Sequence, residues 1–200
     1  MNSMKLPRLS TVKPHRNPHQ DNGVCDNHVQ QEFNQKAPNL VWASDFTYIR
    51  VNGRWVYLCV VMDLFSRKII GWHTSNKHDT ELTTTAFKKA YKSRAVSYGL
   101  IFHSDQGSEY TAFSFRRLLD SLNVVQSFSK KGYPFDNACC ESFFKYLKRN
   151  LINRTNYHSL EELNLNIFEY MNMYNTRLPH SALGYKTPDE YEAEYWDQHQ

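Results

Sequence analysis

No run of about 18 apolar residues occurs in the sequence, so a membrane-spanning helix is not expected. The first residues, MNSMKLPRLSTVK, lack the apolar stretch that is typical of a secretory signal. The four cysteines, Cys25, Cys59, Cys139 and Cys140, show neither Cys-x-x-Cys spacing nor the pattern of a disulfide framework. Zinc binding through cysteine is therefore not expected, and a reducing cytoplasm suits the chain.

Positive charge is concentrated in the middle of the chain. Residues 40–154 hold 17 Lys and Arg against nine Asp and Glu, whereas residues 155–200 hold two against eight. This distribution has two interpretations: a polyanionic partner that binds the middle part alone, or ordinary surface charge with no such partner. With 200 residues, of which 40% are hydrophobic, the chain suits one domain with a buried core, with or without an additional arm.

The residues before position 40 are rich in Pro, His, Asn and Gln and show no periodicity. We therefore expect a flexible N-terminal arm over residues 1–39. Order is expected to begin at Leu40. Domain assignment follows from this boundary: residues 40–196 form the folded domain, with a core to about residue 155 and a C-terminal helical extension after it.

Strand and helix patterns alternate after this boundary. Apolar and β-branched stretches at 40–51, 54–66 and 68–75 predict an antiparallel meander, with Asn52-Gly53 as its first turn. Further strands are predicted over 100–105 and 124–129. Helical periodicity covers 79–95, 112–123, a stretch from Ala138, 159–178 and 187–196. This order predicts an α/β fold: a mixed five-stranded sheet with helices on both faces, plus C-terminal helices.

Two aspartates stand where the local pattern does not favour them. Asp45 lies in the middle of an apolar strand, where a carboxylate is costly to desolvate. It is interpreted as a ligand for a cation, and a hydrogen bond to Ser44 or Thr47 is the alternative. Asp105 ends a later strand, at the edge where open α/β sheets bind ligands, or it begins a turn. His103, two residues earlier, is expected to face solvent, with orientation of Asp105 as the alternative.

A third carboxylate opens the helix that begins near Ala138. Glu141, Lys145 and Lys148 share one face of this helix, opposite a predicted buried stripe of Phe144, Leu147 and Leu151. A solvated face is one interpretation, in which Glu141 pairs with Lys145 and favours the positive end of the helix dipole. In the other interpretation Glu141 is a metal ligand and the lysines contact phosphates. Two or three carboxylates from separate elements can hold Mg²⁺ and leave positions open for substrate.

The acids have 35 residues between Asp105 and Glu141, and they occur within the stretches VWASDFTYI, FHSDQGSEY and SFSKKGYPFDNACCESFFKYLK. With WVYLCVVMDLFSRKIIGW and YNTRLPHSALGYKTP, these motifs cover most of residues 40–188. The chain resembles the retroviral-integrase-like superfamily, and within it the DDE catalytic core of OrfB-type bacterial insertion-sequence transposases. The resemblance implies an RNase H-like fold.

The resemblance also implies a function, which is divalent-metal-dependent phosphodiester cleavage and strand transfer in DNA transposition and recombination. Its catalytic and metal-binding residues would be Asp45, Asp105 and Glu141, with Mg²⁺ as cofactor and Mn²⁺ as a substitute. Asp63 matches an acidic position of the family that is interpreted as structural. The predicted DNA-binding residues are Lys130, Lys131, Lys145, Lys148 and Arg149.

Partners follow from the same resemblance. They are DNA (transposon ends and target), further copies of the chain assembled on DNA and, as a candidate, a separate helix-turn-helix protein. Residues 1–39 show no helix-turn-helix pattern, which suggests a fragment, an isolated domain or a product that relies on a partner. A cytoplasmic, nucleoid-associated location is expected. An RNase H-like nuclease without strand transfer and a catalytically idle DNA-binding remnant are the two alternatives.

Overall fold

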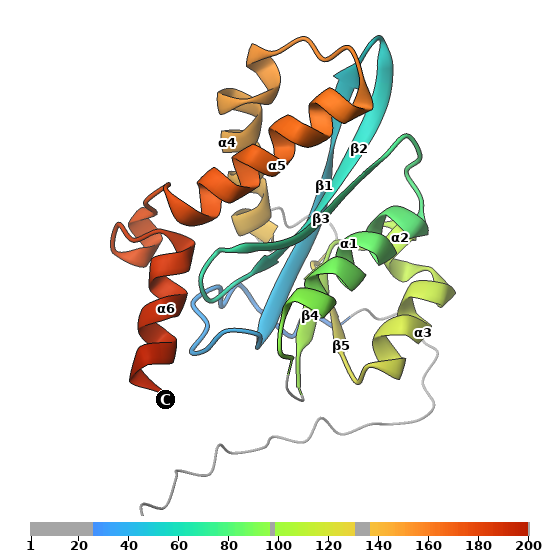
Figure 1. Cartoon of the computed structure of the whole chain (residues 1–200). Helices are drawn as coiled ribbons and strands as arrows, with labels where there is room; N and C mark the ends of the chain where they lie inside the picture. Colours follow the sequence, from blue (N-terminus) through green and yellow to red (C-terminus); the bar gives the residue numbers. More distant parts are fainter. Residues whose placement is uncertain (1–25, 97–98, 131–136, 200) are drawn as a thin grey trace, which may run out of the picture.

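The computed structural model describes residues 26–96, 99–130 and 137–199 (Figure 1). Its elements in chain order are β1 (Val41–Val51), β2 (Arg54–Asp63), β3 (Ile69–Ser75), α1 (Thr80–Ser93), β4 (Ile101–Ser104), α2 (Ser108–Thr111), α3 (Phe113–Ser121), β5 (Val125–Phe128), α4 (Ala138–Asn150), α5 (Leu160–Thr176) and α6 (Pro188–Gln198). In this part of the chain, no helix combines the length and apolar character needed to cross a membrane.

The five strands form one mixed sheet in the order β3-β2-β1-β4-β5. β1 and β3 are antiparallel to β2, whereas β4 is parallel to both β1 and β5. The predicted turn joins β1 to β2, and both of its residues adopt positive φ, 43° at Asn52 and 75° at Gly53. Among the residues of β1, only Val41–Ala43 pair with β4, so β1 continues well beyond the end of β4.

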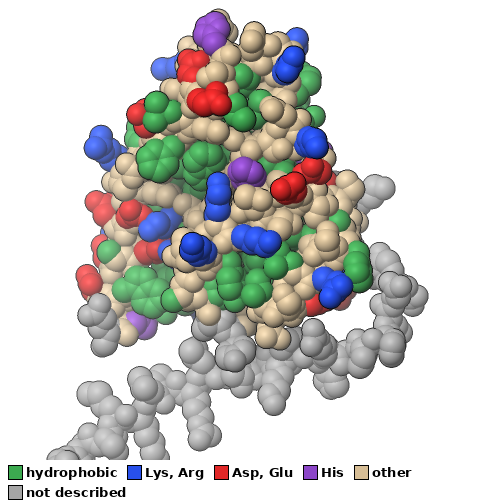
Figure 2. Space-filling view, turned by 45° about the vertical axis from the view of Figure 1, so that its right-hand side comes forward, with side chains coloured by type: hydrophobic (Ala, Val, Ile, Leu, Met, Phe, Trp, Pro, Cys, Tyr) green, Lys and Arg blue, Asp and Glu red, His purple; other side chains and the backbone are tan. Residues whose placement is uncertain are grey.

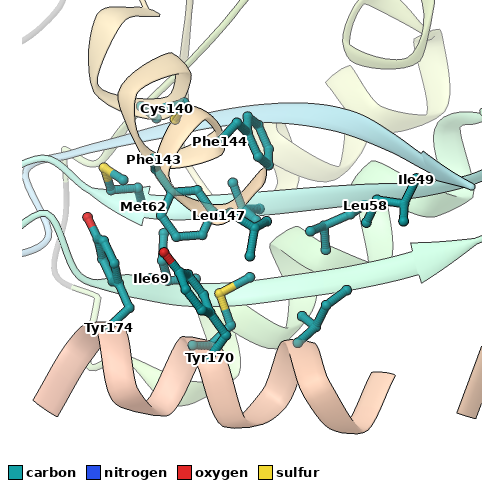
Figure 3. Close-up of a cluster of buried hydrophobic side chains, with 14 of the residues drawn as sticks. Ile49, Leu58, Met62, Ile69, Cys140, Phe143, Phe144, Leu147, Tyr170 and Tyr174 are labelled. Atoms are coloured by element: carbon teal, nitrogen blue, oxygen red, sulfur yellow. The ribbon is translucent and has the colours of Figure 1, made fainter. Parts of the chain in front are cut away.

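Helices cover both faces of the sheet, as predicted, because alternate residues of the central strands point to opposite sides (Figure 1). On one face, α1 and α3 pack over Trp42 and Phe102. On the other face, α4 and α5 enclose Ile49, Leu58 and Met62, as Figure 3 shows. α5 therefore belongs to the same core as the sheet.

Contact between α1 and the sheet depends on a glycine. A Cβ atom at Gly71 of β3 would lie 2.6 Å from the Ala86 carbonyl oxygen and 2.7 Å from the Ala90 Cβ atom. Asp79 begins α1 as expected, since its side chain accepts a hydrogen bond from the Leu82 N–H. The close approach lets α1 bury its inner face directly on the strand.

One local prediction was incomplete. The helix predicted over 112–123 is α3, and extended backbone at Ala112 (ψ 137°) separates it from the short helix α2, which was not predicted. Helical hydrogen bonding starts earlier than predicted, because the Gly107 carbonyl accepts from the N–H groups of Tyr110 and Thr111.

Ordered structure also begins before Leu40. Val29 is buried in the core, the His28 N–H donates to Ser127 Oγ at 3.0 Å, and the Phe128 N–H donates to the Asp26 carbonyl. The arm predicted over 1–39 is thus packed structure from Asp26 onward. Residues 1–25 lie outside the described part.

A buried ionic network joins the C-terminal helix to the sheet. The Arg94 guanidinium, at the end of α1, lies 3.0 Å from Asp63 Oδ2 on β2 and 2.5 Å from Glu192 Oε1 on α6. Asp63 is fully buried and also accepts the N–H groups of Asn39 and Phe65. These contacts support the interpretation that Asp63 has a structural role.

Candidate active site

Asp45 is a partly buried carboxylate in the middle of β1, opposite Val60 of β2. Its pKa is raised from 3.8 to about 7, chiefly by burial and to a smaller extent by the negative charges of Asp105, Glu141 and Glu109, against the lowering effect of the Phe46 N–H. That N–H donates to Asp45 Oδ1 at 2.8 Å. Three acids from other elements therefore act electrostatically on one strand residue.

Among the described residues, Asp45 makes no hydrogen bond to either of the two hydroxyl groups that were its alternative partners. The Ser44 hydroxyl donates to the Val60 carbonyl at 2.8 Å and lies 2.9 Å from the Tyr110 hydroxyl. Thr47 is buried on β1. The Asp45 carboxylate is thus held by backbone, not by the hydroxyl groups beside it in sequence.

Asp105 follows directly after β4 and forms a turn. Its Oδ1 accepts the Gly107 N–H at 3.0 Å, which is the Asx-turn alternative considered for this residue. A Cβ atom at Gly107 would lie 2.1 Å from Glu109 Oε1 and 3.1 Å from Asp105 Oδ1. The glycine therefore allows the two carboxylates to lie close to the same turn.

Glu141 is exposed in the first turn of α4. The start of this helix is tied to β1, because the Asn137 side-chain amide donates to the Ser44 carbonyl at 3.2 Å. Asn137 occupies the N-cap position without making a side-chain capping bond, and Asp136 lies outside the described residues. The anchor is one residue from Asp45, which explains how the charge of Glu141 reaches that carboxylate.

Glu109 is an acidic residue of the site that the sequence interpretation missed. It is 3% exposed, and within the described structure its Oε1 has no hydrogen-bond partner. His78 Nε2 lies 3.5 Å from that oxygen, and the Ser108 hydroxyl donates to the other one at 3.2 Å. Its position four residues after Asp105 was the available signal. No helix was predicted over residues 108–111, so the predicted pattern did not set Glu109 apart.

Asp45, Asp105 and Glu141 fit a divalent cation by their chemistry, although they do not enclose one. Within the described residues, no group of three or more His, Cys, Asp or Glu side chains is spaced to hold a metal ion by itself. Asp105 and Glu141 both raise the pKa of Asp45, so the carboxylates repel one another. A divalent cation would relieve this repulsion, and Mg²⁺ commonly binds through one or two carboxylates and keeps several waters.

The predicted basic residues lie in different surroundings. Lys145 is exposed on α4, and Lys148 Nζ lies 4.9 Å from the centroid of the Tyr48 ring. The Arg149 guanidinium lies over the Tyr146 ring of its own helix. Lys130 is exposed just after β5, and Lys131 lies outside the described residues.

The expectation that His103 faces solvent was wrong. Its side chain is fully buried, with Nδ1 2.9 Å from Ser127 Oγ and Nε2 3.2 Å from Ser129 Oγ. The reason is topological, because β4 lies between β1 and β5 and both of its faces are covered.

One cavity among the described residues lies on another side of α4. It has a volume of about 570 Å³ and lies between α4, the end of α5 and residues 178–185, and Arg67 and His180 contribute to its walls. None of the three predicted catalytic acids lines it. The three predicted catalytic acids therefore lie outside this cavity.

Two family models together match most of the folded part of the chain. Residues 35–134 match one family model described as an integrase core domain, and residues 122–188 match a second model with the same description. The chain belongs to the integrase core domain family. The three acids at 45, 105 and 141 are distributed over both matched regions.

Two bacterial relatives of this integrase core are named as insertion-sequence transposases. It is 42% identical over 167 residues to the transposase for insertion sequence element IS904 of Lactococcus lactis, covering 83% of this chain and 66% of that protein. It is 36% identical over 170 residues to transposase InsF for insertion sequence IS3fB of Escherichia coli, covering 84% and 59%. The integrase core thus spans about three fifths to two thirds of the length of these relatives.

Solved structures share the fold at lower sequence identity. The HTLV-2 integrase catalytic core domain, in complex with magnesium, matches with a TM-score of 0.63 and 18% identity over 78% of this chain and 98% of that one. The catalytic core domain of BIV integrase matches with a TM-score of 0.61 and 17% identity over 81% and 99%. The integrase core therefore has the RNase H-like fold of retroviral integrase cores, as predicted.

Proposed function

We propose that this chain is the catalytic core of a DNA transposase that cuts phosphodiester bonds at element ends and transfers the freed strand. The observation that carries the proposal is the raised pKa of Asp45, which two acids from other elements, Asp105 and Glu141, help to raise. Negative charges are gathered in this way where a cation neutralises them. The bacterial relatives, which are named as transposases, support the same reaction class.

Asp45, Asp105 and Glu141 are the residues that would hold Mg²⁺, with Mn²⁺ as a substitute. A bound ion supplies Lewis-acid activation for hydrolysis and transfer at phosphorus. The protein contributes positions: β1 fixes Asp45, the turn to Gly107 fixes Asp105, and the bond from Asn137 to Ser44 fixes the start of the helix that carries Glu141. The magnesium in the matched HTLV-2 structure supports this choice of ion.

DNA phosphates would be neutralised by basic residues near these acids. Figure 2 shows one face of the molecule, on which Lys and Arg side chains lie across the middle and at the upper end, with acidic side chains at the upper end, along the left edge and to the right of the centre. Lys145 and Lys148 share the helix face of Glu141, and Lys130, Lys131 and Arg149 are the further proposed contacts. Binding should then weaken steeply with salt, because each phosphate contact releases condensed counterions.

Assembly on DNA is part of the proposal. We infer that copies of the chain act together on transposon ends and target DNA, in a cytoplasmic, nucleoid-associated setting. A separate helix-turn-helix protein is the candidate for end recognition. The simian T-cell lymphotropic virus intasome, a match with a TM-score of 0.65 and 15% identity, supports a fold that works within a nucleoprotein assembly.

The proposed function is tested by substituting one acid and following labelled duplex DNA in the presence of Mn²⁺. Asp105→Asn should lower cleavage by about 100-fold or more while DNA binding is retained, because a ligand of the reacting centre is lost. Asp197→Asn, at an exposed acid on α6, is the matched control and should be neutral. Cut products without joined products would support the nuclease alternative, and unchanged cleavage by Asp105→Asn would overturn the assignment.

A further inference from the structure

Two large aromatic side chains lie exposed on the β1–β2 hairpin, although the rest of its apolar residues are largely buried. Tyr48 of β1 is 57% exposed and Trp55 of β2 is 48% exposed. Their ring centroids are 5.1 Å apart, and the ring planes meet at 86°. We call this pair the aromatic ledge. Its two rings support each other edge to face and leave ring surface open to solvent.

Basic side chains surround the aromatic ledge. The Arg50 guanidinium lies 5.3 Å from the Trp55 ring centroid, and Lys148 Nζ lies 4.9 Å from the Tyr48 ring centroid. Arg54 is exposed at the hairpin turn, and the sequence from 46 to 62 contains no Asp or Glu. Exposed rings beside cations, without nearby acids along the hairpin, form the surface that unpaired nucleic acid bases recognise.

Distances along the chain connect the aromatic ledge to the candidate active site. Tyr48 follows Asp45 by three residues of strand, which corresponds to about 10 Å. Lys148 follows Glu141 by seven residues of helix, which also corresponds to about 10 Å. Successive phosphates of one DNA strand are about 3.4 Å apart along the axis, so either path spans about three nucleotides.

Between these two places, the edge of β1 away from β2 makes no strand pairing with the described residues. Asp45 and Tyr48 point to opposite faces of β1, since side chains alternate. β4 pairs with this edge only at Val41–Ala43, and the next bridge on it is between Val51 and Tyr157. Lys148 belongs to α4, which covers the sheet face to which Asp45 points. Its side chain nevertheless contacts the ring of Tyr48, which points to the opposite face. The aromatic ledge is therefore in direct contact with the helix that carries Glu141.

We propose that Tyr48 and Trp55 stack on unpaired bases of a DNA strand about three nucleotides from the cleaved bond. This proposal rests on the proposed function and adds a substrate feature to it, namely strand separation beside the reacting phosphodiester. Arg50 and Lys148 hold the neighbouring phosphates, and the rings take the bases. Stacking is sequence-tolerant, so the aromatic ledge binds any separated strand and leaves recognition of a particular end to other contacts.

The experiment compares two labelled probes, a single-stranded oligothymidine and a blunt duplex, by fluorescence anisotropy in EDTA. The variant Tyr48→Ala/Trp55→Ala should bind the single strand about tenfold or more weakly, because each stacked base is lost. Its affinity for the blunt duplex should change by about twofold at most, because phosphate contacts remain. Tyr48→Phe and Trp55→Phe should retain binding. Trp196→Ala, which removes a Trp of α6 that is 46% exposed, should bind both probes normally.

Several outcomes would overturn the proposal. They are unchanged single-strand affinity of the double alanine variant, an equal loss on both probes, failure of the wild-type protein to bind the single strand, and a change in oligomeric state that explains the loss. Thermal unfolding of each variant separates a folding defect from a binding defect. The assay contains no metal and measures no cleavage, so its result is independent of whether Asp105→Asn abolishes activity.

Discussion

At the scale of single residues, the candidate site is defined by a charge that the fold does not neutralise. Asp45 is held among apolar neighbours of β1, and the nearest charges that act on it are those of three other acids. An arrangement of this kind lowers the stability of the folded protein wherever the carboxylate is ionised. Its presence in the middle of the sheet is explained by binding, because packing alone would favour an uncharged side chain.

The first prediction follows from the sign of this pKa shift. The pKa of Asp45 is raised from 3.8 to about 7, so the folded state binds its proton more tightly than the unfolded state. Protonation of Asp45 therefore stabilises the folded state at low pH, and this stabilisation is lost as pH rises between about 4 and 7. Asp45→Asn should therefore raise the free energy of unfolding at pH 8, by up to about 4 kcal/mol, and flatten its pH dependence.

Denaturant unfolding of both proteins from pH 4 to pH 8 measures this effect. Mg²⁺ should stabilise the wild-type protein at pH 8 and leave Asp45→Asn little changed, because ion binding requires the carboxylate. Asp197→Asn supplies the control for loss of an exposed acid. A wild-type protein whose stability rises steadily over this pH range would contradict the assignment.

At the scale of secondary structure, α4 shows what the sequence predicts well. Its start at Ala138 and its inner residues Phe144 and Leu147 agree with the predicted helix. Cys140 and Phe143 are buried as well, which the predicted stripe did not include. The predicted set of buried residues was too small, because helical periodicity in the sequence identifies a single buried face. α4 has a second contact face, since it packs between the sheet and α5, and Phe143 lies 4.9 Å from the Tyr174 ring centroid.

The same distinction holds for the rest of the fold and for the site. Patterns within about ten residues predicted the strands, the Asn52-Gly53 turn and the cap at Asp79. Glu109, the packed residues from Asp26 and the burial of His103 depend on partners that are distant in sequence. Such partners leave no local periodicity, so these features became visible only in the folded structure.

A second prediction concerns the attachment of α4. Leu147 is fully buried against the sheet, whereas its neighbour Tyr146 is 48% exposed. Leu147→Ala should lower the free energy of unfolding by about 2–5 kcal/mol, through lost apolar burial and the cavity that remains. Tyr146→Ala, one residue away in the same helix, should cost less than about 1 kcal/mol. Urea unfolding measures both, and equal losses would show that α4 does not pack as described.

At the scale of the whole molecule, the acidic C-terminal part is attached by charge as well as by apolar contact. Burial alone would raise the pKa of Glu192, but its hydrogen bonds and ion pair with Arg94 outweigh burial and hold the pKa below its ordinary value. Burial raises the pKa of Asp63, against the opposing effects of Asn39 and Arg94. One guanidinium thus serves two buried carboxylates from segments about 130 residues apart in sequence.

The third prediction is that Arg94→Met leaves these two carboxylates buried without their counter-charge. The free energy of unfolding should fall by about 3–5 kcal/mol at pH 8, because breaking a buried ion pair costs far more than losing an exposed one. The loss should shrink as pH falls, since the unpaired Asp63 and Glu192 then take up protons in the folded state. Lys186→Met, which removes the exposed pair with Glu194, should cost less than about 1 kcal/mol. If both substitutions cost the same, or if the Arg94→Met deficit grows in acid, the network does not hold α6 to the sheet.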